Sequence, residues 1–268
     1  PPTRSTLMSP DRENLCLRSL LCTPGVRNKR IVNVVKQFLV RAGATEKILV
    51  LVEGEISWMQ SLRRSIEGAV NSDAYVSKKE PVRLAFSGVG CPSRDFEIRE
   101  FARPRVLEET SPSCRVLLMP ASFGGIGTDF NNVTQVIHVG PPKTKELTLQ
   151  YAGRCRGAGT VLFLLTWQQH CANLFHTMVA IASQDSDVDT VEEANMQRDD
   201  INATTATLLY PVGCLRQLLE EPFLPLGTTP CRTCRQLYKP LCSGCNLNEK
   251  QSLLHEFREQ LLPWYESN

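Results

Sequence analysis

Apolar residues along the chain fall into two kinds of pattern, continuous runs and stripes with three- or four-residue spacing. The run KILVLV (47–52) predicts a strand that is buried on both faces. The segment RIVNVVKQFLVRA (30–42) instead predicts an amphipathic helix, with Ile31, Val34, Val35, Phe38 and Leu39 on one stripe. A second helix is expected from Ser57, whose hydroxyl suits an N-cap, through Trp58, Met59, Leu62, Ile66 and Val70.

The alternation of strands and helices continues to about residue 167. Strands are predicted at 82–88, 114–120, 134–140 and 159–167, and helices at 93–102 and 144–154. Strands that alternate with helices need crossover connections, which favours an α/β fold with a parallel sheet flanked by helices. Ligands of such sheets gather at the carboxyl ends of the strands, so the glycine-rich loop 120–132 is a candidate binding loop.

The composition changes near residue 184. The segment 183–200 contains seven acidic residues and few apolar ones, as in a solvated connection or an exposed helix face. Beyond it lie CLRQLLEEPFL (214–224), a cysteine cluster and a last amphipathic helix, predicted from about residue 248 to 262. We therefore expect a linker at 1–29, the sheet domain at 30–182 and a small, mainly helical subdomain at 183–268.

Composition and charge narrow the class of protein. Hydrophobic residues make up 42% and charged residues 22%, as in ordinary soluble domains. The net charge of +2 indicates no global attraction to nucleic acid. Apolar runs such as VLFLL (161–165) are too short to span a bilayer, and the first residues do not resemble a secretory signal. We expect an intracellular protein with no membrane partner.

The cysteines give the strongest chemical signal. The sequence has eleven, and CRTCRQLYKPLCSGC contains two CxxC pairs, Cys231 with Cys234 and Cys242 with Cys245. Each pair can offer two thiolates to one tetrahedral ion, which predicts a zinc site. An iron–sulfur cluster and unligated or disulfide-bonded cysteines are the alternatives.

Two glycine-rich loops carry further candidates. Taken alone, FGGIGTD (123–129) is typical of a tight turn, and QYAGRCRGAG (150–159) is typical of a surface loop. Arginine grips phosphate oxygens in pairs, yet the chain contains no GxxxxGK[ST] phosphate cradle. The order of the motifs carries more information: strand, glycine loop with an acid, strand, helix, then Gln-x-x-Gly-Arg and a strand.

That order resembles the last two motifs of superfamily-two helicases, most closely the RecQ branch. ASFGGIGTD (121–129) aligns without a gap, and VIH (136–138), a proline at 141 or 142, Gln150, Gly153 and Arg154 follow in order. SPDRENL (9–15) is also similar to the segment that begins the second motor domain of this family. The resemblance covers about residues 9–170, and the cysteine region extends it.

The resemblance implies the second RecA-like domain of an ATP-dependent 3′-to-5′ DNA helicase, located in the nucleus. Arg154, Arg156 and Gln150 would face the phosphates of an ATP and magnesium held by a missing first motor domain. The residues near the nucleotide would be Asp129, Gly127 and Gly153. Backbone groups around Ser122, Gly124 and Gly125 would touch DNA phosphates. The chain alone is then expected not to hydrolyse ATP.

The resemblance also widens the set of metal ligands. In the RecQ branch the first zinc cysteine opens a helix, and the others follow about seventeen residues later. Cys214 opens CLRQLLEEPFL, and Cys231 lies seventeen positions on. Five cysteines therefore compete for four places: Cys214, Cys231, Cys234, Cys242 and Cys245. The site would be structural, holding a region with little core of its own.

Departures from the family pattern favour a rival interpretation. Arg154 and Arg156 are two residues apart rather than three, the family aspartate after the second arginine is replaced by Ala158 or lost, and Ala121 replaces a hydroxyl residue. The rival is a non-enzymatic relic that acts as a zinc-stabilised DNA- or protein-binding module. A protein-interaction domain without nucleic-acid affinity is a third possibility. His138 and Trp58 are interpreted as packed core residues rather than functional groups.

Overall fold

The computed structural model describes most of the sheet domain and parts of the C-terminal region. The described residues are 14–22, 24–43, 45–53, 56–72, 82–84, 94–103, 114–124, 130–155, 158–166, 196, 199–201, 203–208, 211, 213–220, 223, 233–236, 241–249, 251 and 255.

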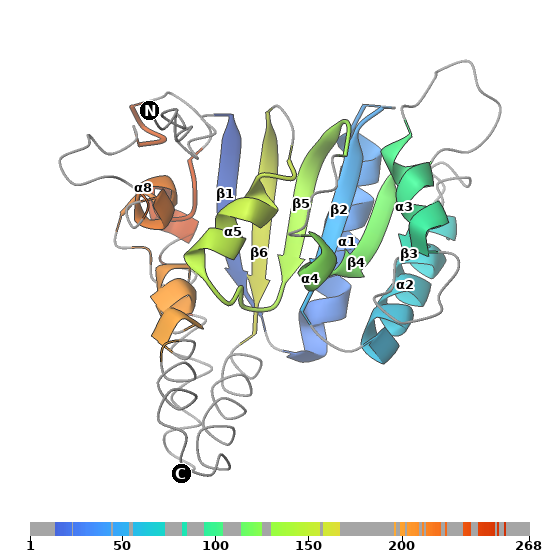
Figure 1. The fold of residues 1–268 in the computed structure, drawn as a ribbon, viewed down its shortest axis with the longest axis horizontal. Coiled ribbons are helices and arrows are strands. Elements are labelled where there is room, and N and C mark those ends of the chain that lie inside the picture. Colours follow the sequence, from blue (N-terminus) through green and yellow to red (C-terminus); the bar gives the residue numbers. More distant parts are fainter. Residues whose placement is uncertain are drawn as a thin grey trace, which may run out of the picture.

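A six-stranded parallel sheet forms the centre of the fold (Figure 1). Its strand order is β1-β6-β5-β2-β4-β3, and every pairing is parallel. The strands are β1 (Leu15–Leu21), β2 (Lys47–Val52), β3 (Val82–Leu84), β4 (Val116–Pro120), β5 (Val133–Val139) and β6 (Gly159–Leu165). The predicted α/β class with a parallel sheet is confirmed.

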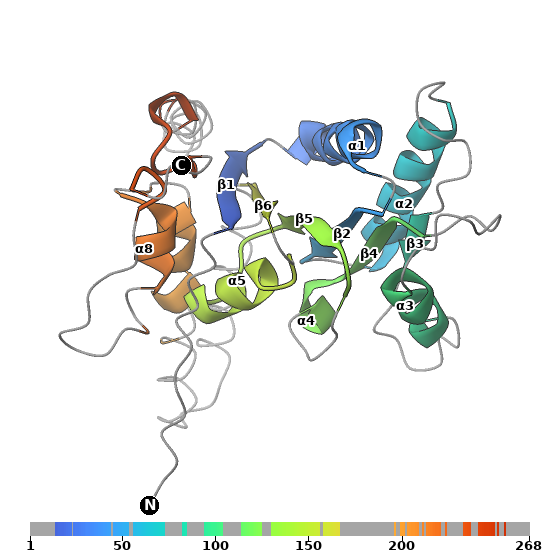
Figure 2. The same ribbon diagram turned by 90° about the horizontal axis from the view of Figure 1, so that it is seen from above.

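Two helices, α1 (Pro24–Arg41) and α2 (Ile56–Asn71), cover one face of the sheet (Figure 2). In the apolar stripe predicted for α1, Ile31 and Val35 are fully buried in one cluster with Val50 and its neighbours on the strands, and Val34 is partly buried. Trp58 joins the two helices: its Nε1 donates to Asn28 Oδ1 at 3.1 Å, and Arg27 lies 3.8 Å over its ring. Trp58 is therefore a packing residue, as predicted.

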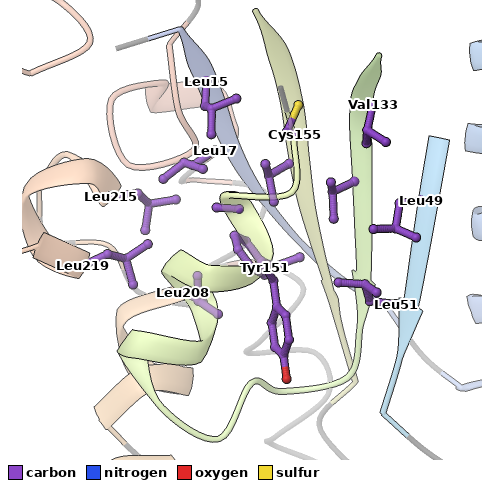
Figure 3. Packing of buried hydrophobic residues seen from close by; sticks show 14 of the residues in the cluster. Leu15, Leu17, Leu49, Leu51, Val133, Tyr151, Cys155, Leu208, Leu215 and Leu219 are labelled. Carbon is purple, nitrogen blue, oxygen red and sulfur yellow. The ribbon is translucent and has the colours of Figure 1, made fainter. Parts of the chain in front are cut away.

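The opposite face is covered by α3 (Arg94–Ala102), the short α4 (Ala121–Gly124) and α5 (Lys145–Ala152) (Figure 2). Thr144 caps α5 by accepting a hydrogen bond from Leu147 N at 3.1 Å. The C-terminal helix α8 (Leu215–Glu220) lies beside α5 (Figure 1). Leu208, Leu215 and Leu219 share one apolar cluster with residues of β1 and α5 (Figure 3). The described part of the C-terminal region thus has no separate core and is built onto the sheet domain.

One strand was not predicted. Residues 1–29 were expected to be a linker, but Leu15–Leu21 is the edge strand β1, which pairs with β6 along its whole length, from Leu15 with Gly159 to Leu21 with Leu165. Arg18 and Ser19 interrupt the apolar residues of its sequence LCLRSLL, so the segment lacks the continuous apolar run by which the other strands were predicted. The sheet domain therefore begins before residue 30. The boundary expected at residues 182 and 183 lies outside the described residues and stays a prediction.

Candidate metal centre

Four buried cysteines lie together at the N-terminus of α8. The sulfur atoms of Cys214, Cys234, Cys242 and Cys245 all lie within 4.8 Å of one another. The Sγ atom of Cys214 is 3.7 Å from that of Cys234 and 3.9 Å from that of Cys242. These separations are too long for a disulfide, whose sulfurs lie about 2 Å apart. The fifth candidate ligand, Cys231, lies outside the described residues.

The cluster fits a tetrahedral zinc ion. With zinc–sulfur bonds of about 2.3 Å, two thiolates on a tetrahedral ion lie about 3.8 Å apart. The two sulfur separations from Cys214 bracket that value. Hydrogen bonds from the Cys234 and Cys242 thiols hold the pKa of Cys214 below its usual range, whereas burial raises the pKa of Cys245 to about 12. Without a cation the cluster keeps thiols protonated, so several thiolates here require a positive charge among them.

Local backbone contacts shape the two cysteine loops. The Cys242 carbonyl accepts from Cys245 N and Asn246 N, both at 2.9 Å, which closes the turn of the second pair. Leu215 N, in the first turn of α8, donates to Cys242 Sγ at 3.4 Å. Arg235 Nη2 donates to Cys245 O at 3.2 Å and ties the loop of Cys234 to that of Cys245. Four ligands from three chain segments are thereby fixed relative to one another.

The second cysteine loop also docks on the outer edge of β1. Ser243 N donates to Leu17 O at 3.1 Å, and Ser19 N donates to Ser243 Oγ at 2.9 Å. Ser243 Oγ in turn donates to Glu249 Oε2 at 2.8 Å, and Glu249 forms an ion pair with Arg18. An exposed sheet edge offers unpaired backbone groups to other chains, and this loop covers part of it. The cysteine cluster is therefore joined mechanically to the sheet.

Gln150, Gly153 and Arg154 lie at and just beyond the C-terminal end of α5. Gln150 is exposed, and its amide donates to Glu146 Oε1 of the same helix at 3.2 Å. Gly153 is the C-cap of α5, and Arg154 is half-buried with its amide bonded to Tyr151 O. Cys155 Sγ lies 2.3 Å from the position that a Cβ on Gly159 would take, so this segment sits beside the first residue of β6.

The predicted nucleic-acid contacts lie at the opposite end of the strands. Ser122 and Gly124 belong to α4, which begins directly after the last residue of β4, and Ser122 is exposed. Because all strands are parallel, the carboxyl end of β4 and the amino end of β6 lie at opposite ends of the strands (Figure 1). The structure thus separates Ser122 from Arg154. Gly125, Gly127, Asp129 and Arg156 lie outside the described residues.

A buried polar cluster at the ends of β2 and β5 was not predicted. His138 has no exposed surface; its Nδ1 lies 3.0 Å from Gly140 O and its Nε2 lies 3.6 Å from Glu53 Oε1. Tyr151 shares a hydrogen bond with the same carboxylate, and burial followed by the charge of Glu53 raises the pKa of Tyr151 well above its usual range. Gly140 has φ of +103°, and a Cβ there would lie 2.7 Å from Glu53 Cβ. The prediction that His138 is a packed core residue is confirmed.

No family model matches the sequence, and a search of curated proteins found no significant match. Among solved structures, the chain is similar to the C-terminal part of the Fun30 ATPase domain, with 13% identity and a TM-score of 0.40, over 65% of this chain and 52% of that one. It spans about half the length of that fragment.

Two DEAD-box proteins are also similar. The first is SrmB of E. coli, solved with the regulator of ribonuclease activity A, with 12% identity and a TM-score of 0.41 over 58% of this chain and 79% of that one. The second is domain 2 of Mss116p, solved on an RNA duplex, with 12% identity and a TM-score of 0.42 over 73% of this chain and 86% of that one. At these identities and scores the likeness assigns neither an activity nor a substrate.

Proposed function

We propose that the chain is the second, RecA-like motor domain of a DNA helicase of the RecQ branch, with a structural zinc site in its C-terminal region. In the complete enzyme a first motor domain would hold ATP and magnesium, and this domain would supply Gln150, Arg154 and Arg156 to the transferring phosphate. ATP hydrolysis would drive 3′-to-5′ movement on DNA in the nucleus. The chain alone lacks a GxxxxGK[ST] cradle and does not turn over ATP.

The position of Cys214 carries this proposal. The CxxC pattern alone points to two pairs as a complete ligand set, with no place for a cysteine twenty residues upstream of Cys234. The resemblance to the RecQ branch instead expects a first ligand at the start of a helix, followed by the others. Cys214 directly precedes α8 and lies within bonding reach of the same ion as Cys234, Cys242 and Cys245. This agreement supports the family assignment independently of the arginine loop.

Ser122 lies at the carboxyl ends of the strands and Arg154 near their amino ends, and this separation suits a division of roles between the two. The edge after β4 would meet nucleic-acid phosphates through backbone donors, which bind phosphate without reading sequence. The segment beside the start of β6 would face the first motor domain and its nucleotide. Nucleotide state and strand movement would then be coupled through the sheet between these edges.

The rival function is a non-enzymatic module that binds DNA or protein and is stabilised by zinc. The two-residue spacing of Arg154 and Arg156 favours it, because a displacement of about 1 Å at such a site can cost roughly 100-fold in rate. The side chain of Gln150 is also bonded within its own helix rather than presented to a partner.

Fusion of the chain behind an intact first motor domain separates the two functions. We expect DNA-stimulated ATPase activity in the fusion, and a loss of about 1,000-fold in kcat on Arg154→Gln. The matched control is Arg99→Gln, which removes the same charge from an exposed position on α3. A folded, zinc-loaded fusion without ATPase activity would establish the rival function.

Binding to single-stranded DNA by the chain itself tests the nucleic-acid role. A backbone contact predicts an affinity that falls steeply with salt and does not depend on base sequence. Absence of any salt-dependent binding would leave only a protein-interaction role.

A further inference from the structure

One face of the sheet turns polar near the amino ends of three adjacent strands. On the α1 side, β6 presents Thr160 before Leu162 and Leu164, and β5 presents Gln135 before Ile137 and Val139. Gln135 and Thr160 are register partners, and Arg18 of β1 is the partner of Leu162. A face that lies under a helix is normally apolar along its whole length. The polar residues Arg18, Gln135 and Thr160 lie together on this face.

Arg18, Gln135, Thr160 and Leu162 line one side of a pocket of about 390 Å³. Its other wall is the C-terminal half of α1, with Val34, Gln37, Phe38 and Arg41. Figure 2 shows α1 above the sheet and β1 to one side of it. The volume is within the range of about 300–1,000 Å³ typical of small-molecule sites. The pocket lies at the amino ends of β5 and β6, away from Ser122 and the carboxyl edge.

The lining offers hydrogen-bond donors that the described protein does not use. Gln37, Arg41, Gln135 and Thr160 have no hydrogen bond or ion pair from their side chains within the described residues. Arg18 also lines the pocket; its Nε and Nη2 donate to Glu249, which leaves its Nη1 outside that ion pair. The acidic residue of the lining, Glu46, turns its Oε2 toward its own loop, where it accepts from Gly43 N at 2.8 Å.

The apolar part of the pocket is held firmly. Phe38 is buried, and the guanidinium of Arg115 lies 5.9 Å from its ring centroid. Arg115 donates to Glu46 O at 3.0 Å and to Gly43 O at 3.1 Å, which fixes the turn that follows α1. The pocket therefore combines an aromatic side chain and Leu162 with donors that come from a helix and from three strands.

We propose that this pocket binds a small phosphate monoester, with its phosphate between Arg41 and Arg18 and its apolar part against Phe38 and Leu162. Arg41 would bind two phosphate oxygens bidentately, Arg18 would add a donor from its Nη1, and the amide and hydroxyl donors of Gln135 and Thr160 would reach the third oxygen. A planar carboxylate would use fewer of these donors because it presents two oxygens in one plane. The site is independent of the proposed motor function and uses none of its residues.

Isothermal titration calorimetry with phenyl phosphate tests the site in the full chain. We expect saturable binding of about one molecule per chain, tighter than that of inorganic phosphate because the ring contacts Phe38. Arg41→Gln should weaken binding about tenfold, and Thr160→Val should weaken it severalfold. Arg30→Gln is the matched control, because Arg30 is also exposed on α1 but does not line the pocket. It should change the affinity less than twofold.

Four results would overturn the proposal. The first is an absence of saturable binding of phenyl phosphate to the folded chain. The second is an equal effect of Arg41→Gln and Arg30→Gln, which would mean that net charge alone attracts the ligand. The third is binding of benzoate as tight as that of phenyl phosphate, which would exclude a phosphate-specific site. The fourth involves single-stranded DNA as a competitor. If the DNA displaces phenyl phosphate from the wild type but binds Arg41→Gln with unchanged affinity, the phosphate contact does not lie at Arg41.

Discussion

The imidazole ring of His138 lies stacked on the phenol ring of Tyr151, with centroids 4.6 Å apart and an angle of 21° between the planes. His138 belongs to β5 and Tyr151 to α5, so the stack joins the sheet to the helix that carries Gln150 and precedes Arg154. Glu53, directly after β2, lies 3.6 Å from His138 Nε2 and shares a hydrogen bond with Tyr151. The position of α5 therefore depends on polar contacts as well as on apolar packing.

Tyr151→Phe removes the hydroxyl and keeps the ring stack. We expect a loss of about 1 kcal/mol in the free energy of unfolding at neutral pH, measured by urea denaturation, because one buried hydrogen bond is lost. Tyr151→Leu also removes the stack and should cost about 1 kcal/mol more. Equal stability of Tyr151→Phe and the wild type would show that the Glu53 contact contributes nothing.

The same substitution predicts a change in pH dependence. The pKa of Tyr151 is raised in the folded protein, so the folded state holds this proton more tightly than the unfolded state, whose tyrosine pKa is about 10. The stabilisation is complete below about pH 10 and is lost as the pH rises above it. The free energy of unfolding of the wild type should therefore fall more steeply above that pH than that of Tyr151→Phe. Parallel curves would contradict the assignment.

Strong periodic patterns were sufficient to predict most of the sheet. After Lys47, β2 is apolar at every position because it lies between two neighbours and under helices on both faces, and its predicted bounds match those observed. The edge strand β1 has one outer side, so it tolerates the exposed Arg18, and the apolar run that marks a central strand is broken there. Edge strands carry a weaker sequence signal for this physical reason.

The metal centre was partly predictable. The CxxC spacing points to a metal because two thiolates from one turn reach one ion, and this holds whatever the surrounding fold. Cys214 carries no such local signal, and only the family resemblance placed it among the candidates. The Glu53–His138–Tyr151 cluster had no signal at all, because its members are far apart in sequence and meet only through the order of β2, β5 and α5.

Metal content tests the cysteine cluster directly. Protein purified under reducing conditions should contain about one zinc ion per chain by elemental analysis, without the visible absorbance of an iron–sulfur cluster. Cys242→Ser should abolish stoichiometric zinc, because Cys242 lies 3.9 Å from Cys214 within the cluster. Cys22→Ser is the control: this cysteine is buried on the α1 face, outside the cluster, and its loss should leave the zinc content unchanged. Full zinc content in Cys242→Ser would remove this residue from the ligand set.

Chelation should also loosen the edge of the sheet. Because the second cysteine loop is hydrogen-bonded to β1 through Ser243, loss of zinc should increase amide hydrogen exchange in residues 15–21. The central strand β2, which β6 and β5 separate from β1, should remain protected. Unchanged exchange in β1 on chelation would mean that the loop holds the edge without the metal.

Gly244 and Gly213 lie close together, and substitution of each by alanine should affect stability very differently. A Cβ on Gly244 would lie 2.0 Å from the carbonyl oxygen of Gly213 and 2.9 Å from Pro211 Cβ, so the cysteine loop would have to move away from the segment before α8. We expect Gly244→Ala to cost about 2 kcal/mol in the free energy of unfolding and to weaken zinc binding, because Cys242 and Cys245 shift with the loop. A Cβ on Gly213 meets no atom within 4 Å, so Gly213→Ala should change stability by less than about 0.5 kcal/mol. Urea denaturation of the zinc-loaded variants, with a competitive zinc indicator for affinity, makes both comparisons. Equal losses in the two variants would mean that the close approach of Gly244 to Gly213 does not determine how the cysteine loop packs.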